Sequence, residues 1–289
     1  IEFRITLAGT PFEHRKINNP DQPGVAYMAL HSIPHIYFPR VQQVFAGLRE
    51  KRNLRNRRMT AKINEIMAPH GIEIDFERDV LPISMYHGGG SVTERHLLSA
   101  LADRIIKEAG TGKVAGFLED TLGLSLSARQ RRWLEEADPL YFRYDVLGIL
   151  KSSLNPRIYI PAVDELITIE QAVAFGKEVD GILCYPYLGD IEDSPTGDKK
   201  AEAFEDSYLD ELFEFLYGKG VRGITFMPSR NNRAQLERLM EKCREFSMYQ
   251  ISGEDINQPR QSFICPQLAE PEFAHLVGAA WSLVDREKV

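Results

Sequence analysis

The first residues of the chain alternate between apolar and polar side chains. Residues 1–7 (Ile-Glu-Phe-Arg-Ile-Thr-Leu) repeat with a period of two, which predicts a half-buried strand. A second, more apolar strand is expected at Val25–His31, after a loop rich in proline, asparagine and glycine. From Pro39 to Pro69 apolar residues recur every three or four positions, which predicts a long helix closed by His70-Gly71. A short strand is expected next, at Ile72–Phe76.

After Asn155 short apolar runs alternate regularly with stretches of helical periodicity. Strands are predicted at 157–161, 181–184, 221–227 and 248–251, and helices at 168–179, 206–217, 232–246 and 273–284. Such alternation predicts parallel strands joined by right-handed crossovers. Six or seven strands in total favour an α/β fold of the distorted (β/α)7-type barrel. Segment 111–155 shows no strand pattern. It is expected to be a helical insertion in a single domain spanning 1–289.

Composition narrows the class of protein. Of the 289 residues 43% are hydrophobic and 27% charged, which is ordinary for a globular protein, and no apolar run approaches the roughly 20 residues of a membrane span. A net charge of −7 and a pI near 5.6 argue against a nucleic-acid partner. The three cysteines, Cys184, Cys243 and Cys265, are odd in number and lack a CxxC spacing, so reduced thiols and a cytoplasmic location are expected.

Polar clusters follow three of the predicted strands. The first is Tyr185–Asp190, the second is 228–232 with Arg230 at its centre, and the third is 252–261. Because the C-terminal ends of parallel strands meet at one edge, these clusters predict a single site.

The predicted helix 39–69 carries a row of cations that includes Arg52 and Arg55. We favour the interpretation that these side chains form a solvated face of the helix. The alternative is a rim that attracts phosphate.

Several of the polar residues are of types that bind metals. Carboxylates suit hard divalent cations, and zinc, iron and manganese also accept imidazole. Glu13 and Asp255 lie near predicted strand ends, and His96 lies in the first turn of a predicted helix. For His96 a structural role at the helix start is an equal alternative. For Glu254 and Asp255 the alternative is that they cap the last helix.

Two arginines near the predicted strand ends suit an anionic substrate. A guanidinium pairs bidentately with phosphate or carboxylate, and Arg230 and Arg260 follow the last two predicted strands. The alternative for each is an internal salt bridge to Glu254 or Asp255. The two interpretations have equal support from the sequence.

Several short motifs in this order resemble a known family. They are Gly9-Thr-Pro-Phe-Glu13, Glu94-Arg-His-Leu-Leu98, Gly181-Ile-Leu-Cys-Tyr-Pro186, Lys219-Gly-Val-Arg-Gly-Ile-Thr-Phe226 and Ser252-Gly-Glu-Asp255. In order and spacing they are similar to motifs of the PHP superfamily, named for its polymerase and histidinol phosphatase members. That family has a distorted seven-stranded (β/α) barrel that binds up to three divalent metals. The resemblance covers most of the chain, best from Arg157 to Asp255.

The resemblance implies a metal-dependent hydrolase that acts on a phosphate ester. It implies zinc, manganese or iron as the metal, no organic cofactor, a small phosphorylated substrate and no membrane partner. The implied metal ligands are Glu13, His96, Asp255 and Asn257. Arg230, Arg260 and Glu254 are the implied catalytic residues. The oligomeric state is left open.

The sequence also departs from the family pattern. The opening His-x-His pair of the family is absent, and we expect it upstream of Ile1, in a longer protein with a strand or strands that this chain lacks. Tyr185-Pro186 stands where the family has His-Pro, and Asn257 where it has a terminal histidine. We therefore predict an incomplete site that holds less than one tightly bound metal per chain. Two alternatives remain: an inactive barrel that binds a ligand or partner, and a barrel that uses Tyr185, Asp190 and Glu254 as acid–base groups on another substrate.

Overall fold

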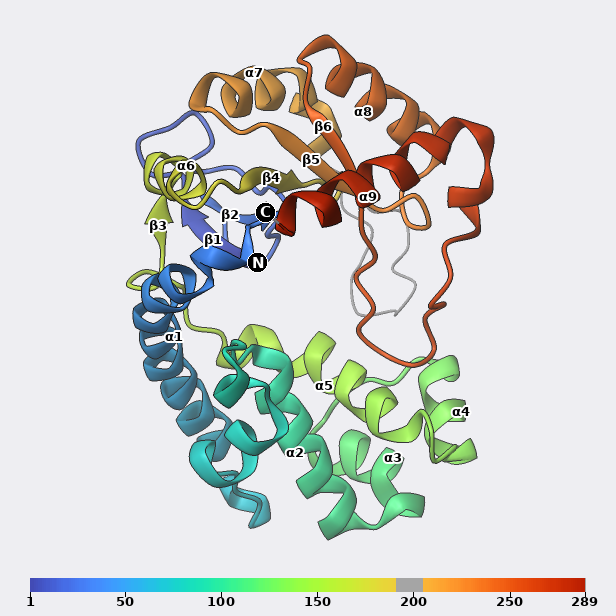
Figure 1. Ribbon diagram of the computed structural model, residues 1–289. Helices are drawn as coiled ribbons and strands as arrows, with labels where there is room; N and C mark the ends of the chain where they lie inside the picture. Colours follow the sequence, from blue (N-terminus) through green and yellow to red (C-terminus); the bar gives the residue numbers. More distant parts are fainter. Residues whose placement is uncertain (191–204, 289) are drawn as a thin grey trace.

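The computed structural model of the chain describes residues 1–190 and 205–288 (Figure 1). Its strands form one six-stranded sheet in the order β3-β1-β2-β4-β5-β6. The strands are β1 (Glu2–Thr6), β2 (Val25–His31), β3 (Ile167–Thr168), β4 (Ile182–Pro186), β5 (Gly223–Phe226) and β6 (Tyr249–Ser252). The predicted α/β class is therefore correct.

The sheet is mixed, and not parallel throughout as predicted. β2 is antiparallel to both of its neighbours, β1 and β4, whereas β1 and β3, β4 and β5, and β5 and β6 are parallel pairs. β1 and β2 are joined by residues 7–24, which form loops and turns, and an antiparallel pair needs no helical crossover. Within the described chain β3 and β6 are the edges of the sheet and do not pair with each other, so a closed barrel is not seen.

Helices lie on both sides of the sheet (Figure 1). They are α1 (Phe38–Met67), α2 (Glu94–Ala109), α3 (Val114–Gly116), α4 (Ala128–Glu136), α5 (Phe142–Ile158), α6 (Ile169–Glu178), α7 (Leu209–Lys219), α8 (Arg233–Glu245) and α9 (Ala274–Glu287). One hydrophobic core forms where the outer face of the sheet packs against α6, α7, α8 and the start of α1. On the inner face, Leu283 of α9 packs against Ile182, Cys184 and Ile251.

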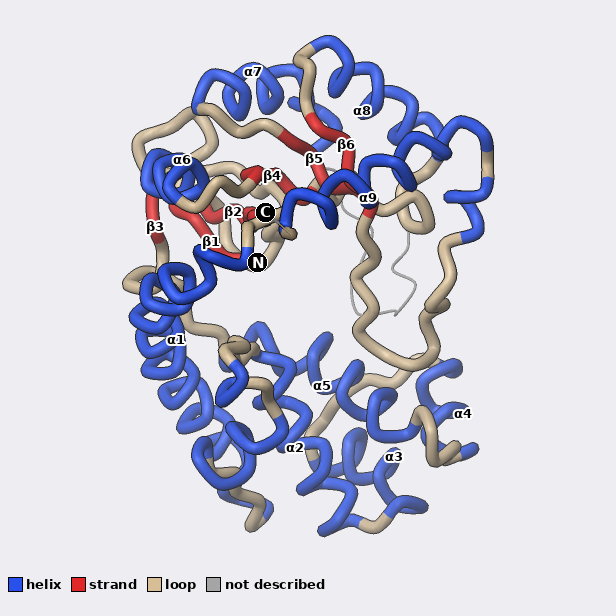
Figure 2. The backbone as a smooth tube through the Cα atoms, viewed as in Figure 1, coloured by secondary structure: helices blue, strands red, loops and turns tan. Residues whose placement is uncertain are grey.

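A second hydrophobic core lies in an all-helical part of the molecule, drawn below the sheet in Figures 1 and 2. It begins at Met59 and ends at Ile158, so it contains the predicted insertion 111–155 and extends beyond it. α1 connects the two cores, because Val41 and Phe45 near its start belong to the first and Met59 and Ile63 to the second. Its 30 residues span about 45 Å at the usual helical rise.

Two predicted strands are absent from the structure, 72–76 and 157–161. In the first, the backbone of Ile74 exchanges hydrogen bonds of 2.8 and 3.0 Å with the side chain of Asn64, so a side chain takes the place of a strand partner. In the second, α5 continues past Pro156 to Ile158. Leu150, Leu154 and Ile158 are buried at four-residue spacing, and this packing overrides the turn signal of Asn-Pro.

The predicted free thiols are confirmed. Cys184, Cys243 and Cys265 form no disulfide, and the first two are buried in the cores around the sheet. Burial raises the pKa of Cys243 to about 12, which keeps that thiol protonated at neutral pH. Among the described helices, none combines the length and apolar character that crossing a bilayer requires.

Candidate functional site

A cavity of about 640 Å³ lies between the inner face of the sheet and the helical part. Its walls come from β1, β2 and β5, from the loops that follow β4, β5 and β6, and from α1, α2 and α5. The helical wall includes the first turn of α2, with Glu94 and Arg95, and the last turns of α5, with Lys151 and Asn155. Segments far apart in sequence therefore share one enclosed space, which is the usual setting of a ligand site.

The inner face of β1 carries a carboxylate and a guanidinium. Side chains alternate between the two faces of a strand, so Phe3 and Ile5 enter the outer core while Glu2 and Arg4 line the cavity. The structure thus places Glu2-x-Arg4, and no pair of imidazoles, on the inner face of its first strand. Burial, and next the negative charge of Asp255, raise the pKa of the Glu2 carboxyl.

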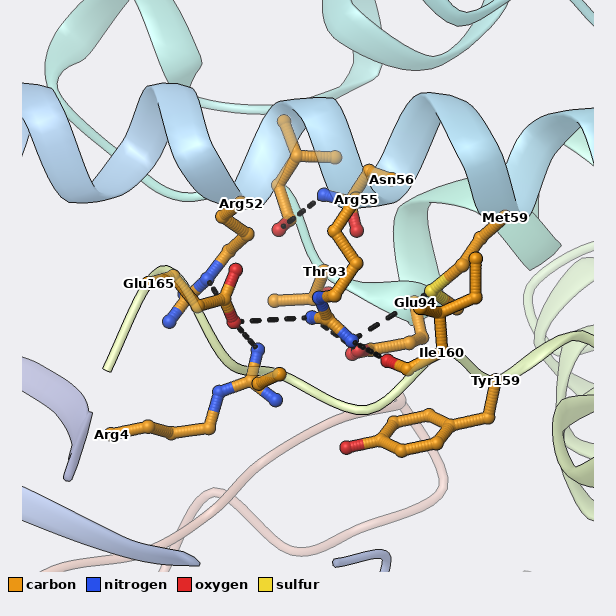
Figure 3. A network of polar contacts seen from close by, with 12 residues as sticks. Arg4, Arg52, Arg55, Asn56, Met59, Thr93, Glu94, Tyr159, Ile160 and Glu165 are labelled. Carbon is orange, nitrogen blue, oxygen red and sulfur yellow. Dashed lines mark hydrogen bonds and ion pairs between the residues drawn. The ribbon is translucent and has the colours of Figure 1, made fainter. Parts of the chain in front are cut away.

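Arg4 belongs to a buried network of three arginines and two glutamates (Figure 3). The carboxylate of Glu165, in the loop before β3, lies 2.5 Å from Arg4, 3.4 Å from Arg52 and 3.3 Å from Arg55. Arg55 also lies 2.9 Å from a carboxylate oxygen of Glu94. The Glu165 side chain is 2% exposed, so water screens these charges poorly.

Charge is not balanced within this network. Its five side chains carry three positive and two negative charges. Burial, and next the positive charge of Arg4, lower the pKa of Arg52, which also has the longest of the three distances to Glu165. Arg4 and Arg52 line the cavity, so two of the three guanidinium groups lie at its wall, where the carboxylates of Glu2 and Glu94 also lie. The preferred prediction of a solvated cationic face is wrong for Arg52 and Arg55, because the helical part folds back over the middle of α1.

The floor of the cavity contains a neutral histidine. His31, the last residue of β2, lies with its Nε2 atom 3.1 Å from the hydroxyl oxygen of Thr225 on β5. Burial lowers the pKa of His31 to about 4, so its imidazole is uncharged at neutral pH. The neutral imidazole has one N–H donor and one acceptor nitrogen, and it adds no charge to the cavity.

Four of the seven predicted site residues line this cavity. They are Arg230, Glu254, Asp255 and Asn257, from the loops that follow β5 and β6. Glu254 accepts a hydrogen bond from the Ser229 hydroxyl, which joins the two loops at the rim. The convergence of strand ends from β4 to β6 was therefore predicted correctly, whereas the roles of these four residues stay predictions.

The other three predicted site residues, Glu13, His96 and Arg260, do not line the cavity, so the prediction of a single site is wrong for them. Glu13 accepts a hydrogen bond of 2.7 Å from the backbone N–H of Gly9 and so closes its own loop. His96, in the first turn of α2, accepts one of 3.0 Å at Nδ1 from the backbone N–H of Thr93, the N-cap residue, and so completes the capping box. Burial lowers the pKa of His96, which keeps this acceptor nitrogen unprotonated.

Arg260 is engaged with the helical part. The loop after β6 extends from the sheet to α4 and α5 (Figure 1), and there Arg260 donates two hydrogen bonds of 2.8 and 2.9 Å to the carboxylate of Asp145. Its guanidinium also lies 4.4 Å from the ring centroid of Trp133 and 4.3 Å from that of Tyr141. The alternative of an internal salt bridge is thus correct in kind, although the partner is Asp145 and not Glu254 or Asp255.

The acid–base alternative fails at Tyr185, because this side chain points to the outer face of the sheet. It is 1% exposed, belongs to the outer core, and donates to the carboxylate of Glu205. The second oxygen of Glu205 accepts hydrogen bonds of 3.0 and 2.7 Å from the backbone N–H groups of Leu188 and Gly189. Tyr185 and Glu205 therefore hold the loop after β4 in place.

This arrangement predicts a dependence of stability on pH. Burial raises the pKa of Glu205 from its ordinary value of 4.5 to about 7. The folded protein therefore holds this proton more tightly, and the resulting stabilisation is present below about pH 4.5 and is lost as the pH rises to about 7. Glu205→Gln mimics the protonated form, so the stability of the wild type relative to the variant should fall by about 3 kcal/mol across this range. Urea unfolding of both proteins from pH 4.5 to 8 measures this difference. A constant difference would show that Glu205 titrates alike in both states.

The metal implied by the family resemblance does not fit the described residues. They contain no group of three or more histidine, cysteine, aspartate or glutamate side chains placed to hold an ion. Glu13 and His96 serve their own loops, and Asp255, whose charge raises the pKa of Glu2, belongs to no such group. The predicted ligand set is therefore not assembled in this part of the chain.

Arg52 and Arg55 were noted as cations of the long helix, but Arg4, Glu94 and Glu165 were not predicted as their partners at the cavity wall. Arg4 was visible as a polar position in a strand of period two, but its direction depends on which face the helices cover. Glu94 and Glu165 carried no signal of their own. The sequence feature that marks the arginines is their alternation with core positions on β1 and α1.

Comparisons with other proteins were informative at the level of fold. The chain matches no family model and no curated protein sequence. Among solved structures it is similar to one from Bifidobacterium adolescentis described as a "putative metal-dependent phosphoesterase", with 15% identity, a TM-score of 0.52, and coverage of 91% of this chain and 71% of that one. An amidohydrolase from Chromobacterium violaceum is also similar, with 13% identity, a TM-score of 0.46, and coverage of 88% and 72%. The first likeness shows that this chain and the Bifidobacterium protein share a fold.

Proposed function

We propose that this protein binds a small phosphorylated compound in its central cavity, as a divergent PHP-type chain whose phosphate site is built from cationic side chains. The observation that carries the proposal is the buried network in which three guanidinium groups (Arg4, Arg52 and Arg55) pair with two carboxylates (Glu94 and Glu165). Glu2 is a further carboxylate near Arg4 and Arg52 at the cavity wall. A buried excess of guanidinium is costly unless an anion is close, and phosphate is a preferred partner of guanidinium. Binding a phosphate group would remove this imbalance.

The shape of the site supports the same ligand class. A cavity of about 640 Å³ lies in the range of small-molecule sites. The first turn of α2, a helix of 16 residues, forms part of its wall, and the N-terminal end of a helix carries a partial positive charge. Arg95, Lys151 and Arg230 also line the space. A phosphate is therefore favoured at the wall formed by α1 and α2.

A second candidate function is metal-dependent hydrolysis of a phosphate ester. It is favoured by the likeness in fold to the Bifidobacterium structure. It is disfavoured by the side chains, since the described residues provide no group of metal ligands. Measurements of ligand binding, metal content and phosphate release distinguish the two candidates.

The test measures binding and hydrolysis together. We expect orthophosphate and small phosphate esters to bind in calorimetry, with an affinity that falls as salt rises, and Arg52→Gln to weaken this binding about tenfold or more. Arg57→Gln is the matched control, because Arg57 lies on the same helix but pairs with Glu77 at the surface. Elemental analysis and phosphate release with added Mn²⁺ or Zn²⁺ test the second candidate.

Each outcome decides between the candidates. Stoichiometric metal that is lost in Asp255→Ala, together with metal-dependent phosphate release, would establish the hydrolase and contradict the predicted low metal content. Equal binding by wild type and Arg52→Gln would contradict the cationic site. Absence of binding for every phosphate compound tested would remove both candidates.

A further inference from the structure

Two neighbouring asparagines in the β1–β2 loop differ completely in their hydrogen bonds. The side chain of Asn18 donates to the carbonyls of Tyr27 (2.9 Å) and Pro186 (2.8 Å) and accepts from the backbone N–H of Tyr27 (2.8 Å). The side chain of Asn19 is equally buried, at 1% exposure, yet neither its Nδ2 nor its Oδ1 has a partner among the described residues. Asn18 thus holds the loop, and Asn19 contributes no internal contact through its amide.

An unpaired buried amide destabilises a fold. Polar side-chain atoms in protein interiors nearly always have a hydrogen-bond partner, and a buried amide without one costs about 1–3 kcal/mol. Asn19 lines the central cavity with both atoms of its amide buried, so a molecule inside the cavity bonds to them when the side chain turns toward it. An unpaired group at such a place indicates a partner that arrives with a ligand.

A second unpaired group lines the same cavity. Asn155, in the last turn of α5, is 7% exposed, and its Oδ1 has no partner in the described parts of the chain. The cavity therefore contains one amide donor and two carbonyl-type acceptors without internal partners, beside the cationic wall of Arg4 and Arg52. The phosphate group of a monoester is mostly a dianion at neutral pH and offers only acceptors, so it could satisfy the donor but not the two acceptors.

We propose that Asn19 determines the specificity of the cavity by binding a neutral group of the ligand that has a hydrogen-bond donor beside an acceptor. This proposal rests on the proposed function, since the same ligand places its phosphate at the cationic wall. Asn19 Nδ2 donates to the acceptor of that group and Asn19 Oδ1 accepts from its donor. The ligand class is thus a phosphorylated organic compound with neighbouring polar groups.

Two kinds of compound carry such a pair. The hydroxyl groups of a sugar phosphate each donate and accept, and the edge of a base in a nucleoside monophosphate presents a donor next to an acceptor. Both fit the stated chemistry, so the experiment includes both. Calorimetry would be run with orthophosphate, a hexose phosphate and nucleoside monophosphates, on wild type and on Asn19→Leu.

We expect Asn19→Leu to leave the affinity for orthophosphate within about twofold and to weaken the organic phosphate that binds best by about tenfold or more. Asn19→Asp, which removes only the donor and adds a negative charge, should also weaken it. The compound whose affinity depends on Asn19 identifies the source of the group. Equal loss for orthophosphate and organic phosphates, or no loss for any, would overturn the proposal.

A measurement without ligand separates specificity from structure. The Tm of unliganded Asn19→Leu should equal or exceed that of the wild type, because no internal hydrogen bond is lost. Asn18→Leu, the matched control, should lower the Tm clearly because it removes three. A drop for Asn19→Leu as large as that for Asn18→Leu would mean that Asn19 is structural. Absence of phosphate binding by the wild type would instead refute the proposed function, and the specificity role with it.

Discussion

Replacing Glu165 with glutamine is expected to lower the free energy of unfolding by about 3–5 kcal/mol, the usual cost of removing one partner from a buried ion pair. The glutamine has the same shape, but it leaves Arg4, Arg52 and Arg55 without the carboxylate that they share at 2.5 to 3.4 Å. Of their ion-pair partners in the described chain, only Glu94, which pairs with Arg55, would remain. Urea unfolding monitored by circular dichroism measures the loss.

A surface pair provides the control for this experiment. Glu178 accepts from Arg40 at 2.5 Å, as close as the Arg4–Glu165 contact, but both side chains are nearly half exposed. Glu178→Gln should therefore cost less than about 1 kcal/mol. If phosphate binds at the cationic wall, it should also raise the Tm of Glu165→Gln more than that of the wild type. A loss for Glu165→Gln no greater than for the control would show that the arginines are hydrated and not interdependent.

Arg260→Ala is expected to lower the free energy of unfolding by about 3 kcal/mol and to release the loop that follows β6. The substitution leaves the Asp145 carboxylate, 1% exposed, without its bidentate partner and removes the cation–π contacts with Trp133 and Tyr141. This loop carries Glu254, Asp255 and Asn257 to the cavity rim, so ligand binding should weaken as well. Limited proteolysis should cut residues 254–265 sooner in the variant than in the wild type.

A double-mutant cycle tests whether the effect comes from this pair. Asp145→Asn removes the buried charge, so the double variant should recover part of the loss, and the coupling energy should be about 1–3 kcal/mol. Arg260→Lys retains the charge but not the planar fork, and it should lie between wild type and alanine. Arg233→Ala, at a surface arginine that is 60% exposed, should change stability little. Additive effects of Arg260→Ala and Asp145→Asn would refute the coupling.

The part of the candidate site that lies at strand ends was predictable from the sequence. The part formed by contacts between the sheet and the helical part was not. Arg230, Glu254 and Asp255 follow strands, and parallel neighbours bring their ends to one edge. Arg260 follows the same strand as Asp255, but its loop is long enough to reach α5, and residue types cannot reveal that distance. His96 illustrates a different limit, because a histidine at a helix start has the same local pattern whether it caps the helix or binds a metal.

The sequence by itself determined most of the secondary structure, including β1, β2, the whole of α1 and the alternating elements from α6 onward. These depend on periodicity and capping within a few residues, as at Thr168 and Gln171 before and within α6. Only the tertiary structure decided that β2 runs antiparallel, that 157–161 extends a helix, and that Arg4, Glu94 and Glu165 meet beside one cavity. The reason is that a residue's local pattern specifies its face on a helix or strand, whereas its partner depends on how distant elements pack to bury their apolar faces.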